Sequence, residues 1–355
     1  MPDVVLVTGV SRLLGGLTAT ALAAREDVGQ VVGIDVVPPA RPLPGVDFVR
    51  ADLRNPVVGR LVERYAVDTV VHMGVIATPT AAGGRASQKE INVLGTMQLL
   101  AACQKAPAIR RLVVKSAAAV YGASPHDPAV LAETAALGVR TADGFGRDSG
   151  EVETYVAGFS RRRPEVEVSV LRFANVIGPS IATGLTDLFS LPVVPIPAGF
   201  DGRLQFVHED DCVRAMVLGA TGSAERVVGT TNVAGDGVLT VSQCAGIVRR
   251  PVVPTPLAAE GSLRRAFRWS RMAELPEGQL HQLAYGRVVD TRLMRERLAF
   301  EPTWTTRQAF ESFARSATLT VPGVDLARTG LRQVDTVLAA VGLRPDPATT
   351  PGARP

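Results

Sequence analysis

The segment from residue 4 to residue 25 constrains the fold more than any other part of the sequence. Residues 4–7 form an apolar, β-branched run typical of a buried strand, and residues 13–25 form a Leu- and Ala-rich stretch that predicts a helix. Between them, Gly9 permits a tight turn and Gly15 permits close packing of the helix on the strand. The first turn of such a helix presents free backbone N–H groups, so the segment predicts a pyrophosphate site.

Short apolar runs continue to alternate with helical stretches up to about residue 173. This alternation predicts a parallel sheet covered by helices on both faces. We therefore expect an α/β fold, with a Rossmann-type doubly wound parallel sheet in residues 1–175. A smaller C-terminal substrate lobe is expected over 176–316, with segments that return to the first domain. Residues 317–355 would form a C-terminal extension, and its Pro-, Thr- and Ala-rich end is expected to be disordered.

Composition argues against several other classes of protein. The net charge is only +4, and the densest basic run, residues 161–163, is interpreted as a solvated helix end, so we expect no nucleic-acid partner. Three widely spaced cysteines and four histidines without metal-ligand spacing predict neither a disulfide framework nor a metal site, which favours a cytoplasmic protein. No run approaches the ~18 apolar residues of a membrane span, so no membrane partner is expected.

Several later motifs extend the pattern of the first segment. Asp35 closes the second expected strand, where a ribose hydroxyl would bind. The other motifs are Ala51-Asp52-Leu53, Val70-Val71-His72-Met73-Gly74, Asn92, Val120-Tyr121-Gly122, Leu171-Arg172-Phe173-Ala174-Asn175, Gly178-Pro179, and Arg203 to His208 followed by Asp211. With these motifs, residues 3–315 resemble an extended short-chain dehydrogenase/reductase of the NAD-dependent epimerase/dehydratase group. The resemblance implies an NAD(P)-dependent oxidoreductase that acts on a CH–OH or C=O group.

The resemblance also implies a path of cofactor contacts along the chain. The residues expected on it are Gly9, Ser11, Arg12, Leu13, Leu14 and Gly15 at the phosphates, Asp35 and Arg41 at the ribose, Asp52 and Leu53 at the adenine, Met73, Gly74 and Val75 on the inner face, and Ala174 near the nicotinamide.

Arg12 occupies the position where the family's loop usually has its middle glycine. Its guanidinium could bind the 2′-phosphate of NADP, with help from Arg41. Alternatively, Arg12 could face solvent. Asp35 points to NAD, because a carboxylate repels that phosphate. The sequence thus predicts NADP(H) or NAD(H), with Arg12 favouring NADP(H).

The residues that normally move the proton in this family are missing. The resemblance places Ala117, Phe145 and Ser149 where the family has its catalytic serine, tyrosine and lysine. Neither an alanine nor a phenylalanine can exchange a proton. Ser116, one residue from the serine position, is the remaining candidate. The carbonyl end of the substrate pocket is expected to contain Ser116, Ala117, Tyr121 and Phe145, although Tyr121 could instead be structural.

The missing groups and an apolar segment at 181–200 suggest a function. That segment could cap a substrate or pack as ordinary core. The favoured hypothesis is a ketoreductase of an aromatic polyketide of the angucyclinone type, a hydroxylated aromatic ketone. Hydride would come directly from the cofactor, and the proton from a neighbouring substrate phenol or from water.

Two other functions stay open. The chain could be a non-catalytic NAD(P)-binding sensor or assembly protein. A nucleotide-sugar epimerase or dehydratase ranks last, because Phe145 cannot remove a hydroxyl proton. The resemblance further implies a possible homodimer formed through helices near 91–106 and 149–163.

Overall fold

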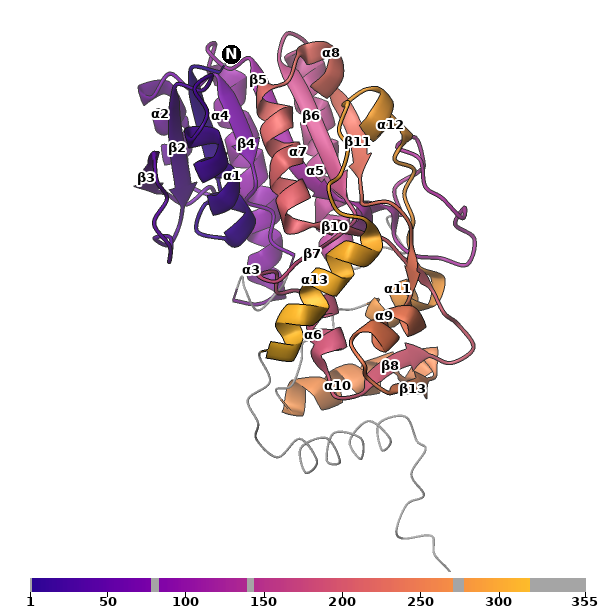
Figure 1. Cartoon of the computed structure of the whole chain (residues 1–355). Coiled ribbons are helices and arrows are strands. Elements are labelled where there is room, and N and C mark those ends of the chain that lie inside the picture. The colour runs from indigo at the N-terminus through magenta and orange to yellow at the C-terminus, as the bar shows by residue number, and fades with distance from the viewer. Residues whose placement is uncertain (1, 78–82, 139–143, 271–277, 320–355) are drawn as a thin grey trace, which may run out of the picture.

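A seven-stranded sheet forms the centre of the protein, which we describe from a computed structural model covering residues 2–77, 83–138, 144–270 and 278–319 (Figure 1). Its strand order is β3-β2-β1-β4-β5-β6-β11, and all pairings are parallel. The strands are β1 (Val4–Thr8), β2 (Gln30–Asp35), β3 (Val46–Arg50), β4 (Thr69–His72), β5 (Arg111–Ala117), β6 (Glu167–Phe173) and β11 (Gly229–Val233).

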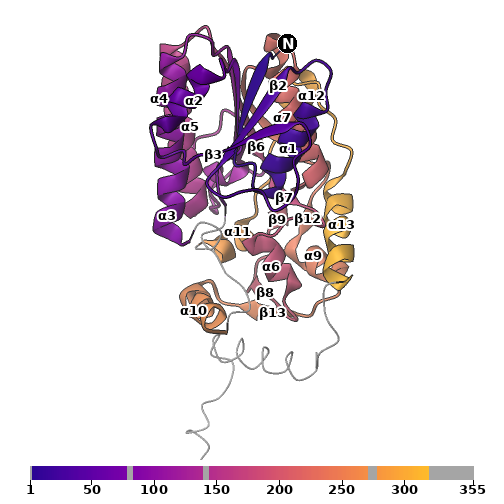
Figure 2. The same cartoon turned by 90° about the vertical axis from the view of Figure 1, so that its left-hand side faces the viewer.

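Helices cover both faces of this sheet, as Figure 2 shows with the sheet viewed between two helical layers. On one face lie α1 (Leu13–Ala23) and α7 (Glu209–Thr221), which contact each other; on the other lie α2 (Val57–Arg64), α4 (Gly95–Lys105) and α5 (Gly144–Arg162). Coverage on both faces explains why β4 is buried along its whole length. The predicted doubly wound parallel sheet is confirmed.

The order of the sheet reverses between β1 and β4. From β1 the chain winds outward through β2 to β3, and then it crosses back to β4 and continues through β5 and β6 in the other direction. The loops after β1 and β4 therefore diverge, and they leave a crevice at the carboxyl ends of these strands. Open α/β sheets bind their ligands at such a switch point.

A second, smaller core lies beyond the carboxyl ends of the strands, at the bottom of Figure 1. Its elements are α6 (Gly184–Ser190), β8 (Val194–Pro197), α9 (Val241–Ile247), β13 (Val252–Thr255), η4 (Leu257–Ala259), α10 (Glu260–Ser270), α11 (Gln279–Tyr285) and α13 (Thr306–Leu319). Three two-stranded pairings, β10 with β7, β12 with β9 and β13 with β8, complete this part. Between these elements the chain returns to the main sheet through α7 and β11.

The remaining short elements complete the fold. They are α3 (Arg85–Lys89), a π-helix η2 (Glu90–Leu94), η3 (Ala118–Tyr121), β7 (Asn175–Ile177), β9 (Arg203–Leu204), β10 (Phe206–His208), α8 (Ala224–Val227), β12 (Leu239–Thr240) and α12 (Arg292–Glu296). Within the described residues, every helix is too short or too polar to cross a bilayer. Most of the expected C-terminal extension, residues 320–355, lies outside the described part of the chain.

A buried hydrogen-bond chain links β1 to β4 next to the switch point. The Thr8 hydroxyl accepts from the backbone N–H groups of Met73 and Gly74, both at 3.1 Å. With both N–H groups directed at its oxygen, Thr8 donates its own hydrogen to Nδ1 of His72, 2.8 Å away. This arrangement fixes His72 as the tautomer with its proton on Nε2.

His72 continues this chain toward α4. Its Nε2 donates to the Thr96 hydroxyl at 2.9 Å, and that hydroxyl donates to the Asn92 carbonyl at 2.5 Å. Burial, together with the nearby charge of Lys115, lowers the pKa of His72 to about 4. The imidazole therefore stays neutral at physiological pH and serves as a structural bridge.

The stability of the protein should consequently depend on pH through His72. Between pH 6.5 and about 4, the unfolded chain binds a proton on this histidine and the folded protein does not. We expect the free energy of unfolding to fall as the pH is lowered through this window, by roughly 3 kcal/mol in total. Urea denaturation at a series of pH values measures this change in the free energy of unfolding.

Glutamine at position 72 provides the control. His72→Gln keeps one hydrogen-bond donor and one acceptor but cannot titrate, so the variant should lose this part of the pH dependence while its carboxylates still respond. Identical pH slopes in the two proteins would contradict the assignment.

Candidate active site

The loop between β1 and α1 is held by backbone-to-backbone contact. Gly9 has a φ of +74°, and a Cβ there would lie 2.9 Å from the Cα of Gly74, at the end of β4. A Cβ on Gly15 would lie 2.1 Å from the carbonyl oxygen of Gly9. Side chains cannot fit at either position, so the start of α1 sits directly on the strand end. This cradle suits the pyrophosphate of a dinucleotide.

The carboxylate of Asp35 is fixed at the end of β2. One oxygen accepts from the backbone N–H of Ser11 at 3.0 Å, and the other accepts from that of Val36 at 2.7 Å.

The residues predicted on the adenosine side of the site lie in different environments. Arg41 is exposed in the segment after β2, whereas Leu53 approaches the Gly74 backbone. Asp52 pairs with Arg54 at 2.7 Å.

Arg12 lies just before α1 and does not face solvent. It is half-buried and lines the main cavity, with its pKa lowered by burial and partly restored by the charge of Asp35. Arg12 thus borders the same cavity as the loop after β1, and the part of a cofactor that it would contact stays a prediction.

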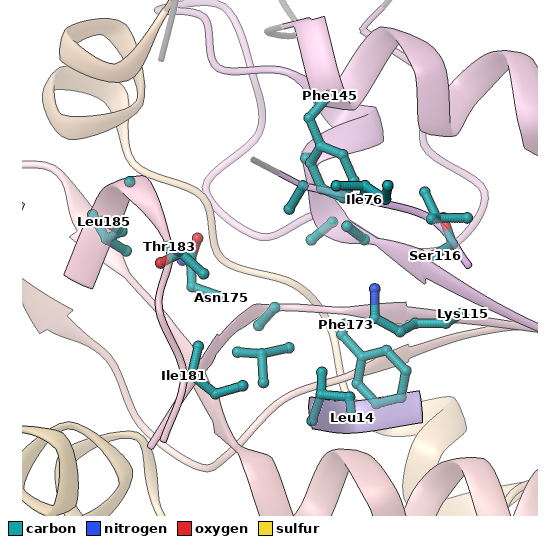
Figure 3. A pocket seen from close by; sticks show the side chains of 18 of the residues that line it. Leu14, Ile76, Lys115, Ser116, Phe145, Phe173, Asn175, Ile181, Thr183 and Leu185 are labelled. Atoms are coloured by element: carbon teal, nitrogen blue, oxygen red, sulfur yellow. The ribbon is translucent and has the colours of Figure 1, made fainter. Parts of the chain in front are cut away.

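A cavity of about 500 Å³ opens from the phosphate loop toward the second core (Figure 3). Of the predicted cofactor residues, those that line it are Ser11, Arg12, Leu13, Leu14, Gly15, Met73, Val75 and Ala174. Its far end is more polar and contains Asn175, Gln279, Gln282 and Arg287. The cavity is large enough for a small-molecule ligand.

Two of the three triad positions lie in the wall of this cavity. Ala117 and Phe145 line it, and Figure 3 shows the Phe145 ring next to Ile76. Ser149 lies elsewhere: it is buried within α5, and its hydroxyl has no hydrogen-bond partner among the described residues. The two residues that the resemblance aligns with the family's tyrosine and lysine, Phe145 and Ser149, thus provide no proton to the cavity.

Ser116 reaches the cavity wall, but its hydroxyl is engaged elsewhere. It donates to Oε1 of Glu153 at 2.5 Å. The same carboxylate accepts two hydrogen bonds from Arg172. Nε donates to Oε1, and Nη2 donates to Oε2 at 2.6 Å. The hydrogen bonds and charge of Glu153 outweigh burial and raise the pKa of Arg172 above its ordinary value. Ser116 is therefore tied into a buried ion pair.

Tyr121 does not line the cavity, in contrast to our expectation. Its hydroxyl donates to Oδ1 of Asn232 at 2.8 Å and accepts from Nη1 of Arg172 at 2.7 Å. The side chain is 2% exposed, and burial raises its pKa despite the charge of Arg172. Tyr121 therefore has the structural role that the sequence left open as an alternative. The one-turn helix η3 carries its side chain away from the cavity.

The apolar segment 181–200 contributes its first five residues, 181–185, to the cavity wall. Ile181 and Leu185 line it, whereas Leu188 and Phe189 point into the second core. The large apolar side chains of α6 are all buried, and Leu185 belongs to both the cavity wall and the second core. Ordinary core packing therefore accounts for most of this segment.

Lys115 is among the cavity residues that the sequence analysis missed, and it is one of the charged ones. It lines the cavity from β5, and Figure 3 shows its amino group directed into the space above Phe173. The signal in the sequence was a single charge in the apolar run Leu112-Val113-Val114-Lys115 of an expected buried strand. Such a charge calls for an explanation, because burying an isolated ammonium is costly.

We expect Gly15→Ala to prevent both normal folding and dinucleotide binding. The added Cβ would overlap the Gly9 carbonyl, and we expect a loss of about 3 kcal/mol or more in unfolding free energy. Thermal denaturation and an NADH fluorescence titration measure the two effects. Gly59→Ala in α2 is the matched control, since its Cβ would meet only Ala102 at 3.9 Å and should stabilise by about 0.5–1 kcal/mol. A Gly15→Ala variant as stable as the wild type would refute the contact.

Ser116→Ala and Glu153→Gln should differ strongly in stability. Removing the serine hydroxyl costs about 1 kcal/mol, whereas Glu153→Gln leaves Arg172 buried without its counter-charge and costs about 3 kcal/mol or more. Urea denaturation ranks the two. Ser116→Ala should also lower turnover by less than ~100-fold, and a loss beyond ~1000-fold would identify Ser116 as the proton donor after all.

Comparison with known proteins agrees with this architecture. An uncharacterized protein of Mycobacterium tuberculosis is 42% identical over 326 residues, covering 90% of this chain and 85% of its own. Two solved structures match at a TM-score of 0.69: UDP-glucose 4-epimerase of Thermotoga maritima with UDP-glucose, at 18% identity, and that of Thermus thermophilus complexed with NAD, at 21%. Each match covers 90% of this chain and 100% of the other, and the likeness concerns the fold. Residues 5–234 match the sequence model of the NAD dependent epimerase/dehydratase family, and the chain belongs to that family.

Proposed function

We propose that this protein is an NAD(H)-dependent oxidoreductase that interconverts an alcohol and a carbonyl without a catalytic tyrosine. The observation that carries the proposal is a single cavity that joins an intact dinucleotide cradle to a wall without the usual acid, at Ala117 and Phe145. When bound, the dinucleotide would supply or accept a hydride. The glycine contacts of the loop would hold its pyrophosphate, and Asp35 would hold its ribose hydroxyls.

The arrangement around Asp35 favours NAD(H) over the NADP(H) that Arg12 suggested. Both carboxylate oxygens of Asp35 are held by backbone N–H groups, so this charge would meet a 2′-phosphate directly. Arg12 lines the cavity together with Lys115, and Arg41 is exposed. We therefore assign Arg12 to the pyrophosphate, and NADP(H) becomes the second choice.

For the substrate, we keep a hydroxylated aromatic ketone as the first candidate. Met73, Val75, Ile76, Phe145 and Leu185 give the cavity apolar walls that suit a flat ring system. Reduction of such a ketone needs the carbonyl placed by the walls and a proton from a source other than position 145. An aromatic polyketide of the angucyclinone type meets this description.

A nucleotide sugar is a second candidate, and the far end of the cavity favours it. Asn175, Gln282 and Arg287 line that end. Asn175 and Gln282 are joined by a hydrogen bond of 2.9 Å, and Arg287 donates to the Gly122 carbonyl. These groups could bind a diphosphate. The Thermotoga maritima neighbour, whose structure contains UDP-glucose, adds support. Epimerisation or dehydration of a nucleotide sugar needs a base. A basic side chain in the cavity wall, other than residue 145, would meet that need.

One set of assays tests the proposal. We expect NADH to bind at least about tenfold more tightly than NADPH, since Asp35 repels the additional phosphate, and Asp35→Ser to reduce this preference. Turnover is then followed by NADH absorbance with hydroxylated aromatic ketones, and by product analysis with UDP-sugars and NAD.

The outcomes separate the hypotheses. Ketone reduction supports the first candidate, and epimerised or dehydrated UDP-sugar supports the second. Tight NADH binding without turnover on either panel would overturn the enzymatic proposal in favour of a dinucleotide-binding sensor or assembly protein.

The expected homodimer stays a prediction. Leu94 and Met97, in η2 and α4, and Tyr155, in α5, are among the exposed large apolar side chains, and they lie on the two helical regions implied by the family resemblance. Covering them in a dimer would remove apolar surface from water.

A further inference from the structure

The position of Lys115 on β5 directs it to one side of the sheet. Side chains alternate along a strand, so Lys115 shares a face with Val113, which packs in the core beneath α7. Ser116 points the other way, to Glu153 on α5. Lys115 is therefore separated from the buried ion pair that engages Ser116, and its amino group reaches the cavity instead (Figure 3).

In the part of the chain that the structure describes, no carboxylate contacts the amino group of Lys115. Within the described residues, it makes no hydrogen bond or ion pair. Burial lowers its pKa, and the positive charge of Arg12 lowers it further, against an opposing influence from Cys212 on α7. The other titratable neighbour is His72 on β4, which is neutral. Lys115 can therefore exchange its proton nearer to neutral pH than an ordinary lysine.

The rarity of lysine in this chain makes the residue more informative. Of the 38 basic residues, three are lysines, and the other two, Lys89 and Lys105, are exposed on α3 and α4. Arginine holds its proton across the whole physiological range, whereas a buried lysine can release it. If this position needed only a positive charge, an arginine such as Arg12 would serve equally well. If it needs a group that exchanges a proton, arginine cannot serve and lysine can.

We propose that Lys115 is the catalytic acid–base residue of this site. It would take the role of the missing tyrosine from the face of β5 opposite to that of Ser116. The inference rests on the proposed oxidoreductase function. In reduction, hydride from the dihydronicotinamide bonds to the carbonyl carbon, and the C=O π pair moves to the oxygen. That oxygen takes a proton from the Lys115 ammonium. The products are the alcohol, the oxidised dinucleotide and a neutral amine, which regains a proton from water.

In the reverse direction the same amine is the base. Neutral Lys115 takes the hydroxyl proton as hydride leaves the carbinol carbon for the oxidised dinucleotide. This is the step that Phe145 cannot perform. With Lys115 as acid, a substrate phenol is not required, and ketones without one become accessible.

Three variants test the proposal. Lys115→Met keeps a side chain of similar length without the charge, and Lys115→Arg keeps the charge without a proton that exchanges at physiological pH. Lys105→Met is the matched control, because it replaces an exposed lysine by methionine. We expect the two Lys115 variants to lower turnover by about 100-fold or more. Lys115→Met should bind NADH within about threefold of the wild type, and Lys105→Met should match the wild type throughout. Lys115→Met should melt at or above the wild-type temperature, because it removes a half-buried charge that has no ion-pair partner among the described residues.

A second readout does not depend on activity. In protein labelled with ¹³C-lysine, three side chains give signals, and Lys115→Met assigns one of them by its disappearance. We expect the pKa of Lys115 in the NADH complex to lie below 10.5 and to coincide with the pH above which kcat/KM for reduction declines. Reduction of a ketone whose neighbouring phenol is methylated should continue.

Several results would overturn the assignment. Wild-type turnover that survives in Lys115→Met would exclude Lys115 as the acid while leaving the proposed function intact. NADH affinity that falls tenfold in Lys115→Met and returns in Lys115→Arg would make Lys115 a cofactor-binding charge. If the wild type turns over no substrate, the proposed function fails separately, and a Lys115 pKa at 10.5 in the NADH complex then contradicts the inference as well.

Discussion

The backbone contact among Gly9, Gly15 and Gly74 is the constraint on which the site depends. It brings the ends of β1 and β4 and the start of α1 within van der Waals distance at the point where the sheet reverses direction. The crevice, the free N–H groups of α1 and the inner wall after β4 all follow from it. The buried chain from Thr8 through His72 fixes the same junction on the side of α4. Arg12 can replace the middle glycine because that position faces the cavity, where a side chain has room.

Beside this rigid cradle, polar groups are divided between two sides of the sheet. On the α5 side, Ser116, Glu153, Arg172 and Tyr121 satisfy one another and hold the wall in place. On the α7 side, Lys115 reaches the cavity without a partner among the described residues. Burial and the nearby charge of Arg12 lower the pKa of Lys115. Under the proposed function, the proton-exchanging group would lie on the α7 side of β5, while the dinucleotide would bind at the glycine loop after β1.

Predictions from the sequence succeeded where local pattern and backbone geometry coincide. Gly9, Gly15 and Asp35 occupy the positions expected of them, because a glycine turn between a strand and a helix has few possible conformations. Predictions about side-chain direction were less successful. Tyr121 lies next to cavity residues in the sequence, but the turn of η3 carries it into a hydrogen-bond network. Most of the apolar segment 181–200 packs in the second core, where Leu188, Phe189 and Leu191 are buried. Lys115 was overlooked because it occupies no position in the family's motif.

By itself, the sequence determined the doubly wound sheet and the glycine turn between β1 and α1, and the family resemblance places Ala117, Phe145 and Ser149 at the positions of the family's serine, tyrosine and lysine. These depend on strand and helix periodicity and on residue identity, which are local properties. Only the tertiary structure decided which charged side chain meets the cavity and which is paired. That outcome depends on the face of β5 that each residue occupies and on what packs above it. The partners of Ser116 and Tyr121 come from segments between 37 and 111 residues away in the chain, and Lys115 has none among the described residues. No sequence pattern brings such groups together.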